Sequence, residues 1–298
     1  MANSSSDLSR DLPKVNFWDE PDVLTQWEGF WLFTALVDPA MTFRSNFVAR
    51  DDDVLLTSLP KTGTTWLMAL SHSILKKGER GDPLTTNNPH SLVPTIESEP
   101  LSNHCNLDIY DASASRLLHT HLPYSVLPDS VKDSACKIVY IARSPKDTLI
   151  SMWHFYNVIF RRDREPLPLD RAVDFFCSGM HPGGHFSDHV AEYWLESRRR
   201  PDKILFLKYE EIKSHPKREI SRIAEFLGRP FTEEGEVEEL LWRCSFERLK
   251  KLEVNKTANA KFFRKGQVGD WKNYLTSDME DRINQTVGLK LEALGLFF

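Results

Sequence analysis

Apolar runs of strand length alternate along the chain with segments whose apolar residues recur at helical spacing. The strand-like runs are residues 53–59, 117–123, 137–142 and 203–207. The helices expected after them are residues 65–75, 146–159 and 220–227. This alternation predicts an α/β fold, with a central, mostly parallel β-sheet covered by helices on both faces. Because ligands bind at the carboxyl ends of the strands in such sheets, we expect the chemistry there.

No repeat and no Gly/Ser-rich or Pro-rich linker divides the 298 residues, so we expect a single domain over residues 17–298. Residues 1–16 are polar and lack the apolar segment of a secretory signal, which predicts a disordered tail. The early apolar stretch 30–37 is shorter than the roughly 20 residues needed to cross a bilayer. These features predict a cytoplasmic protein that does not enter the membrane.

Charge and cysteine content narrow the function further. The net charge of −5 gives no overall basic field that would recruit nucleic acid, so an anion site must be a local cluster of cations. The four cysteines lie far apart and form no CxxC pair. This pattern argues against a zinc site or a disulfide framework and fits a reducing compartment.

The turn after the first strand has the features of an anion cradle. Its sequence is Pro60-Lys-Thr-Gly-Thr-Thr-Trp66. Gly63 lets the backbone curl so that successive N–H groups face an anion, and the following helix adds the positive end of its dipole. Lys61 supplies a full charge. The hydroxyls expected to add donors are those of Thr62, Thr64 and Thr65.

This turn differs from the cradle of nucleoside triphosphates, which places its lysine after the second glycine of G-x-x-x-x-G-K-[ST]. Here Lys61 precedes the only glycine, Gly63. The strand 137–142 also leads into Arg143, where an ATPase places a magnesium-binding Asp. Both departures favour an anion held by cations without a metal. Glycine-containing turns between strand and helix are common, however, so this turn alone does not decide the function.

Two further segments carry candidate anion ligands. Arg143 and Ser151 lie eight residues apart, at a strand end and on the helix after it. Arg264 and Lys265 directly precede Gly266, an arrangement typical of a backbone that wraps a phosphate. The alternative for each cation is an ordinary solvated position.

Histidines supply the candidate acid–base chemistry. His119 and His121 share one face of the strand-like run 117–123, and a neutral imidazole can take the proton of an attacking hydroxyl. The alternatives are a structural histidine or half of a metal pair, and the pair lacks further ligands nearby. The histidines at 181, 185 and 189 are interpreted as loop residues, because Pro182 to Gly184 interrupt any helix between the first two.

Three of these segments, in order, resemble the signature regions of the cytosolic sulfotransferases. They are residues 60–66, the Tyr-Ile-Ala-Arg-Ser-Pro-Lys-Asp stretch at 140–147, and the Arg-Lys-Gly…Gly-Asp-Trp-Lys stretch at 264–272. The resemblance runs from about residue 47 to 274. Residues 86–94 and 29–32 are most similar to the plant branch, which acts on secondary metabolites and hormones.

The resemblance implies a role for each candidate residue. The co-substrate would be 3′-phosphoadenosine 5′-phosphosulfate (PAPS), bound without a metal. Lys61 to Thr65 would hold its 5′-phosphosulfate. The 3′-phosphate would be held by Arg143, Ser151, Arg264, Lys265 and Gly266, and the adenine by Trp66, Tyr209 and Phe246. His121 matches the catalytic base, Lys61 would stabilise the leaving phosphate, and Phe155 would contact the acceptor.

The acceptor and the assembly are less defined. An aromatic-lined slot suits a small hydroxylated molecule such as a phenol, flavonoid, steroid or oxylipin. His119 stands where many animal members have lysine, which we interpret as tuning of activity. Ser277 and Asp281 depart from the family's dimerisation motif, so we expect a monomer or a weak dimer. Residues 160–190 could form a lid. Two alternatives stay open, a P-loop small-molecule kinase and a nucleotide-binding protein that has lost catalysis.

Overall fold

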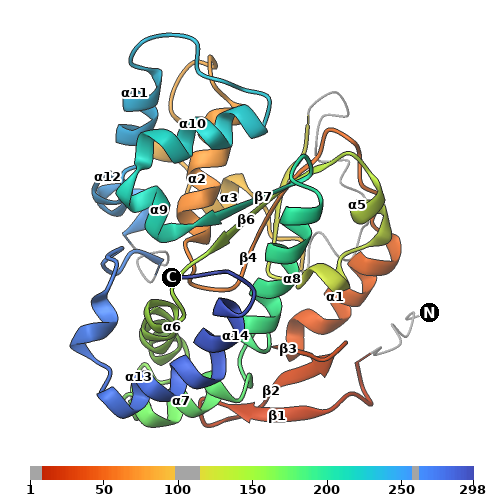
Figure 1. Cartoon of the computed structure of the whole chain (residues 1–298), viewed down its shortest axis with the longest axis vertical. Helices are drawn as coiled ribbons and strands as arrows, with labels where there is room; N and C mark the ends of the chain where they lie inside the picture. The colour runs from red at the N-terminus through yellow and green to blue at the C-terminus, as the bar shows by residue number, and fades with distance from the viewer. Residues whose placement is uncertain (1–8, 98–114, 257–261) are drawn as a thin grey trace.

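The computed structural model describes residues 9–97, 115–256 and 262–298, and its centre is a four-stranded parallel sheet (Figure 1). The strands are β4 (Val54–Ser58), β5 (Leu117–Thr120), β6 (Lys137–Ala142) and β7 (Ile204–Lys208). Their order in the sheet is β5-β4-β6-β7, and every neighbouring pair is parallel. The predicted fold class is therefore confirmed.

Alternate residues of each strand enter two separate cores, one on each face of the sheet. Leu56 and Val139 belong to one core, whereas Leu55 and Ile138 belong to the other. This is why the strands read as continuous apolar runs, since both of their faces are covered. The helices that pack in the Leu56 core include α2 (Thr64–Leu75), α9 (Tyr209–Ser214), α10 (Pro216–Phe226), α11 (Glu236–Arg243) and α12 (Phe246–Lys251).

The Leu55 core is larger and contains more aromatic rings. Its helices are α1 (Thr34–Asn46), α6 (Pro145–Phe160), α7 (Leu169–Cys177), α8 (Phe186–Arg199), α13 (Ser277–Ile283) and α14 (Leu289–Glu292). Shorter elements complete the chain: α3 (Pro89–Leu92), α5 (Asp129–Asp133), a π-helical turn (Asn284–Gly288) and the 3₁₀ turns Pro83–Thr85, Tyr124–Val126, Glu253–Asn255 and Asp270–Asn273. Among the described residues, no helix is long and apolar enough to cross a membrane.

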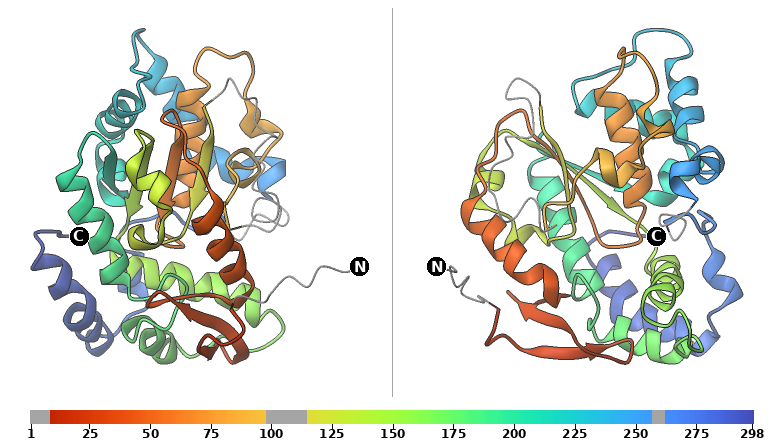
Figure 2. Two further views of the ribbon diagram at one scale, coloured as in Figure 1. Left: turned by 90° about the vertical axis from the view of Figure 1, so that its right-hand side faces the viewer. Right: turned by 180° about the vertical axis from the view of Figure 1, so that it is seen from behind.

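A second, antiparallel sheet near the N-terminus was not predicted (Figure 2). It consists of β1 (Lys14–Phe17), β2 (Glu20–Trp27) and β3 (Phe30–Phe33). The predicted tail of residues 1–16 is thus wrong at its end, because residues 14–16 belong to β1; residues 1–8 lie outside the described part. Phe17 is fully buried, with its ring centroid 5.3 Å from that of Phe175 in α7.

The region considered as a lid, residues 160–190, does not form one separate element. Arg161 and Arg164 bind Asp19 and Glu20 beside the N-terminal sheet, and α7 follows. His189 is not a loop residue as predicted. It lies in α8, fully buried, because the helix begins right after the interrupting Gly184 and His185.

Candidate active site

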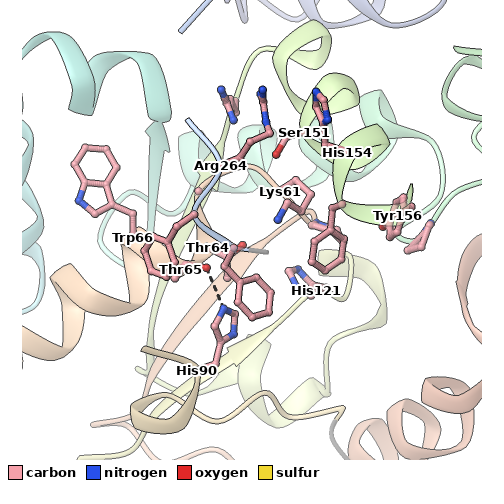
Figure 3. A pocket seen from close by; sticks show the side chains of 18 of the residues that line it. Lys61, Thr64, Thr65, Trp66, His90, His121, Ser151, His154, Tyr156 and Arg264 are labelled. Carbon is pink, nitrogen blue, oxygen red and sulfur yellow. Dashed lines mark hydrogen bonds between the residues drawn. The ribbon is translucent and has the colours of Figure 1, made fainter. Parts of the chain in front are cut away.

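A cavity of about 540 Å³ lies at the carboxyl ends of β4, β5 and β6 (Figure 3). Every residue that the sequence assigned to the site lines it, with the single exception of Thr62. Figure 3 shows Lys61 near its middle, with Ser151 and Arg264 on one side and His121 on another. Segments more than 200 residues apart in the chain therefore meet at one place, as the parallel sheet predicts.

The turn after β4 adopts a backbone shape that few residues tolerate. Lys61 has a φ of +72° and Gly63 a φ of +119°. The hydroxyl of Thr62 is buried and contacts the carbonyl oxygens of Leu59 and Ile141 at 2.8 and 3.0 Å. This corrects the expectation that Thr62 offers its hydroxyl to an anion, since it fastens the turn to β6 instead.

The other two threonine hydroxyls of this turn also have partners. Thr64 Oγ1 lies 2.7 Å from Ser58 Oγ at the end of β4. Thr65 Oγ1 lies 2.9 Å from Nε2 of His90. α2 begins at Thr64, and the first main-chain donors to the carbonyl of Gly63 are the N–H groups of Trp66 and Leu67, both at 3.0 Å. The N–H groups of Thr64 and Thr65 precede these bonds and are the ones that a helix N-terminus offers to an anion.

Substituting Gly63 by alanine is expected to weaken nucleotide binding strongly. A Cβ there would lie 2.9 Å from Tyr209 Cδ2 and 3.0 Å from Ile141 Cδ1, and the positive φ would be strained as well. The turn must shift to relieve both, at a cost of about 1–3 kcal/mol. Calorimetric titration with adenosine 3′,5′-bisphosphate measures the effect. Gly228→Ala is the matched control, because Gly228 has a φ of +69° with no atom near its would-be Cβ. Equal affinities in the two variants would contradict the prediction.

Cations from two distant segments converge on one side of the cavity. The guanidinium of Arg143 is largely buried, donates to the carbonyl of Gln267 at 2.6 Å and lies 4.6 Å from the centroid of the Tyr209 ring. Its Nε has no hydrogen-bond partner among the described residues. Arg264 and Lys265 both pair with the buried Asp270, at 2.7 and 2.8 Å. This side of the cavity is therefore positively charged and holds an unused donor.

Two carboxylates that the sequence reasoning did not single out organise these cations. Asp147 in α6 accepts hydrogen bonds from the N–H groups of Gly269 and Trp271. These bonds fasten the C-terminal loop, residues 264–271, to α6. Burial would raise the pKa of Asp270, but hydrogen bonds from Lys265 and Arg264 lower it to about 2. Asp147 lies in the signature segment 140–147, and Asp270 lies in the segment 264–272. In both segments an acidic residue stands among several cations, and this pattern is the sequence signal that could have revealed them.

Aromatic rings form a platform next to the turn. The rings of Trp66 and Tyr209 lie 5.5 Å apart at 69°, and Trp66 is only half-buried, so it is not an ordinary core residue. The hydroxyl of Tyr209 donates to the carbonyl of Gly266 at 2.8 Å. Gly266 in turn packs closely on Phe246, whose ring would lie 2.8 Å from an added Cβ. The C-terminal loop is thus fitted against the aromatic platform.

His121 is poised as a neutral base. Its Nδ1 lies 2.7 Å from the carbonyl oxygen of Ser58, so Nδ1 carries the proton and Nε2 keeps a free lone pair. Burial is the main reason that the pKa of His121 is lowered to about 4; the contact with Ser58 raises the pKa in part, and the charge of Lys61 lowers it by a smaller amount. The ammonium of Lys61 lies 4.0 Å from the centroid of the Phe155 ring. The base, the cation and an aromatic ring of the cavity wall therefore lie close together.

His119, which stands where many animal members have lysine, does not face the cavity. It is buried behind His121 with ring centroids 4.4 Å apart, and it does not line the cavity. Its ring nitrogens lie 3.3 Å from Thr95 Oγ1 and 3.5 Å from Ser58 Oγ. Burial lowers the pKa of His119 well below its ordinary value, so the ring is neutral. It supports the site without facing it.

Among the residues that line the cavity, the sequence reasoning did not single out two histidines and one carboxylate: His90, His154 and Glu97. The ring of His90 stacks on Phe262 at 4.3 Å. Burial, together with the nearby Arg264, lowers the pKa of His154 to about 4. Within the described residues, no group of His, Cys, Asp or Glu side chains is placed to hold a metal ion.

Comparisons with known proteins agree with this geometry. The family model "Sulfotransferase domain" matches residues 51–295. The chain is 40% identical to cytosolic sulfotransferase 16 of Arabidopsis thaliana, over 97% of this chain and 91% of the relative. It is also 40% identical to flavonol 4′-sulfotransferase of Flaveria chlorifolia, over 92% and 89%.

Solved structures give the same result. A putative steroid sulphotransferase of Arabidopsis thaliana superposes with a TM-score of 0.76 at 34% identity, over 99% of this chain and 95% of the other. A mouse sulfotransferase complexed with PAP superposes with a TM-score of 0.72 at 27% identity, over 91% and 95%. The match therefore covers nearly the whole chain in sequence and in structure.

Proposed function

The chain belongs to the sulfotransferase family, and we propose that its cavity binds PAPS and transfers the sulfuryl group to a hydroxyl of a small, apolar acceptor. One observation carries this proposal. A neutral histidine with a free Nε2 lies on one side of a central lysine ammonium, and cations that include Arg264 line the other side of the same cavity. The mouse relative was crystallised with PAP, which is adenosine 3′,5′-bisphosphate, the donor without its sulfuryl group.

The donor fits the residues present. We assign its 5′-phosphosulfate to Lys61 and to the N–H groups at the start of α2, where Gly63 leaves room that a side chain would fill. We assign the 3′-phosphate to Arg143, Ser151, Arg264, Lys265 and Gly266. The unused Nε of Arg143 is a buried donor that a phosphate oxygen would satisfy. The adenine belongs between Trp66, Tyr209 and Phe246, which supply ring faces for stacking.

Transfer then needs only positioned groups. Nε2 of His121 takes the proton of the acceptor hydroxyl while the oxygen of that hydroxyl forms the new bond to sulfur. The bond between sulfur and the 5′-phosphate oxygen breaks, and the ammonium of Lys61 stabilises the charge that develops on that oxygen. The products are the sulfated acceptor, which is an anionic sulfate ester, and adenosine 3′,5′-bisphosphate; the acceptor's proton remains on His121 until solvent removes it.

The acceptor end of the cavity is mainly apolar, with Phe33, Leu36 and Phe155 among its walls. Such walls favour a flat or hydrophobic hydroxylated molecule. The Flaveria relative is named for a flavonol, which belongs to this class. Because the Arabidopsis relatives are named cytosolic, we propose the same compartment for this chain, as a monomer or weak dimer.

Calorimetry without added metal tests the donor site. Adenosine 3′,5′-bisphosphate should bind more tightly than ATP or AMP, and PAPS should then support transfer to members of a phenolic, flavonoid and steroid panel. Preference for ATP with magnesium-dependent turnover would favour the kinase alternative. Tight bisphosphate binding without transfer to any acceptor would favour a protein that has lost catalysis.

We expect the ring of His121 to stay neutral down to unusually low pH. Its pKa is lowered to about 4, so the ring is a competent base at any pH above about 5. Proton NMR of the Cε1–H resonance in the ligand-free protein measures this directly, with the signal assigned by its loss in His121→Gln. A titration midpoint near the ordinary value of 6.5 would contradict the prediction.

A further inference from the structure

We propose that Glu97 is a positioning residue that holds the main chain of His121 and thereby aims its imidazole at the acceptor. This inference rests on the proposed role of His121 as the base. Glu97 is only 3% exposed and lines the cavity. One of its oxygens, Oε1, accepts the main-chain N–H of His121 at 2.8 Å and also the hydroxyl of Thr120.

The chain before Glu97 runs beside the strand that carries the histidines. Ile96 donates its N–H to the carbonyl of His119 at 2.8 Å, and His119 donates to the carbonyl of Pro94 at 3.0 Å. β5 ends at Thr120, so the next N–H, that of His121, has left this ladder. Glu97 provides the acceptor that the strand no longer supplies, as buried N–H groups require.

His121 is consequently held at three points. Its N–H binds Glu97, its carbonyl oxygen lies 3.0 Å from Nε2 of His189, and its ring Nδ1 binds the carbonyl of Ser58. Three contacts fix both the peptide and the ring, so the direction of Nε2 is determined. Without the Glu97 contact the peptide between Thr120 and His121 can rotate, and a displacement of about 1 Å at a reacting group costs about 10²-fold in rate.

The other oxygen of Glu97 points to a role beyond stability. Oε2 is buried and has no partner among the described residues, and burial raises the pKa of Glu97. An apolar side chain would avoid this cost, but it would leave the main-chain N–H of His121 without its acceptor. Because only Oε1 is used, the amide oxygen of glutamine can accept the same two hydrogen bonds, whereas alanine cannot.

Three variants test the inference: Glu97→Ala, Glu97→Gln and Glu97→Asp. We expect Glu97→Ala to lower kcat by about 10–100-fold while the Kd for PAP changes less than threefold. Glu97→Gln should recover kcat to within a few-fold of the original, and Glu97→Asp, whose carboxylate is one methylene shorter, should not. The matched control is Glu192→Ala, because Glu192 also accepts a main-chain N–H and a hydroxyl, both from Ser125, yet lies outside the cavity.

The outcomes separate this inference from the proposed function. Normal kcat in Glu97→Ala together with an inactive His121→Ala would overturn the inference and leave the function standing. Turnover that survives in both would remove His121 as the base, and the inference with it. Equal losses in the Ala and Gln variants would also overturn it, since the hydrogen bonds alone would then not explain the effect. If Glu97→Ala fails to fold, a normal Gln variant beside a slow, folded Asp variant supports the inference.

Discussion

Replacing His121 by alanine is expected to reduce kcat by about 10²–10⁴-fold, the range typical for loss of a general base. The structure leaves one nitrogen of this ring for chemistry, because Nδ1 is committed to the carbonyl of Ser58. Alanine removes that nitrogen and leaves Lys61, the turn and the cationic side of the cavity in place. The affinity for PAP should consequently stay within about threefold, since no contact assigned to the nucleotide is lost.

The measurement is single-turnover transfer from saturating PAPS, beside calorimetry with PAP on the same preparations. His215→Ala serves as the control, because His215 is exposed at the start of α10 and does not line the cavity. Turnover retained in His121→Ala would remove His121 from the role of base. Loss of PAP binding together with turnover would show instead that the substitution disturbs the turn through Ser58.

The parallel sheet was predictable because its signals are local. Residues 137–142 were expected as a strand and form β6 with these bounds, and the helix expected over 65–75 begins one residue earlier, at Thr64. The N-terminal sheet gave no such signal. β1 has the sequence Lys-Val-Asn-Phe, and its polar residues, Lys14 and Asn16, are exposed. In sequence this short segment is similar to a polar tail, and only its pairing with β2 makes it a strand.

The candidate site shows the same division between local and long-range information. Glycines and cations stand out in sequence because a turn or a signature needs those residue types at fixed spacing, as at Lys61 and Gly63. The carboxylates that organise them do not stand out. Asp147 acts on N–H groups 122 and 124 residues further along the chain, and Glu97 acts on a residue 24 positions away. Only the folded chain reveals which acid meets which donor.

Replacing Arg264 by alanine is expected to raise the Kd for adenosine 3′,5′-bisphosphate by about 10–100-fold. A hydrogen bond to a charged group contributes about 1.5–3 kcal/mol, and each 1.4 kcal/mol is about a tenfold change in affinity. The guanidinium is a quarter exposed, so a bound phosphate can reach it without unfolding the loop. Asp270 keeps Lys265 and Asn273 as partners in the variant, so no carboxylate is left buried and unpaired.

The specific claim is that Arg264 acts on the 3′-phosphate, and a second ligand isolates it. AMP lacks that phosphate, so its affinity should be the same for the original chain and for Arg264→Ala. Arg243→Ala is the matched control, since Arg243 also pairs with a carboxylate, Glu239, but does not line the cavity. Losing AMP and bisphosphate affinity equally would mean that the substitution collapses the adenine platform through Gly266 and Phe246. A loss confined to the bisphosphate means that Arg264, in the C-terminal loop 121 residues beyond Arg143, contacts the 3′-phosphate of the donor. The site would then distinguish PAPS from 5′-nucleotides by this phosphate.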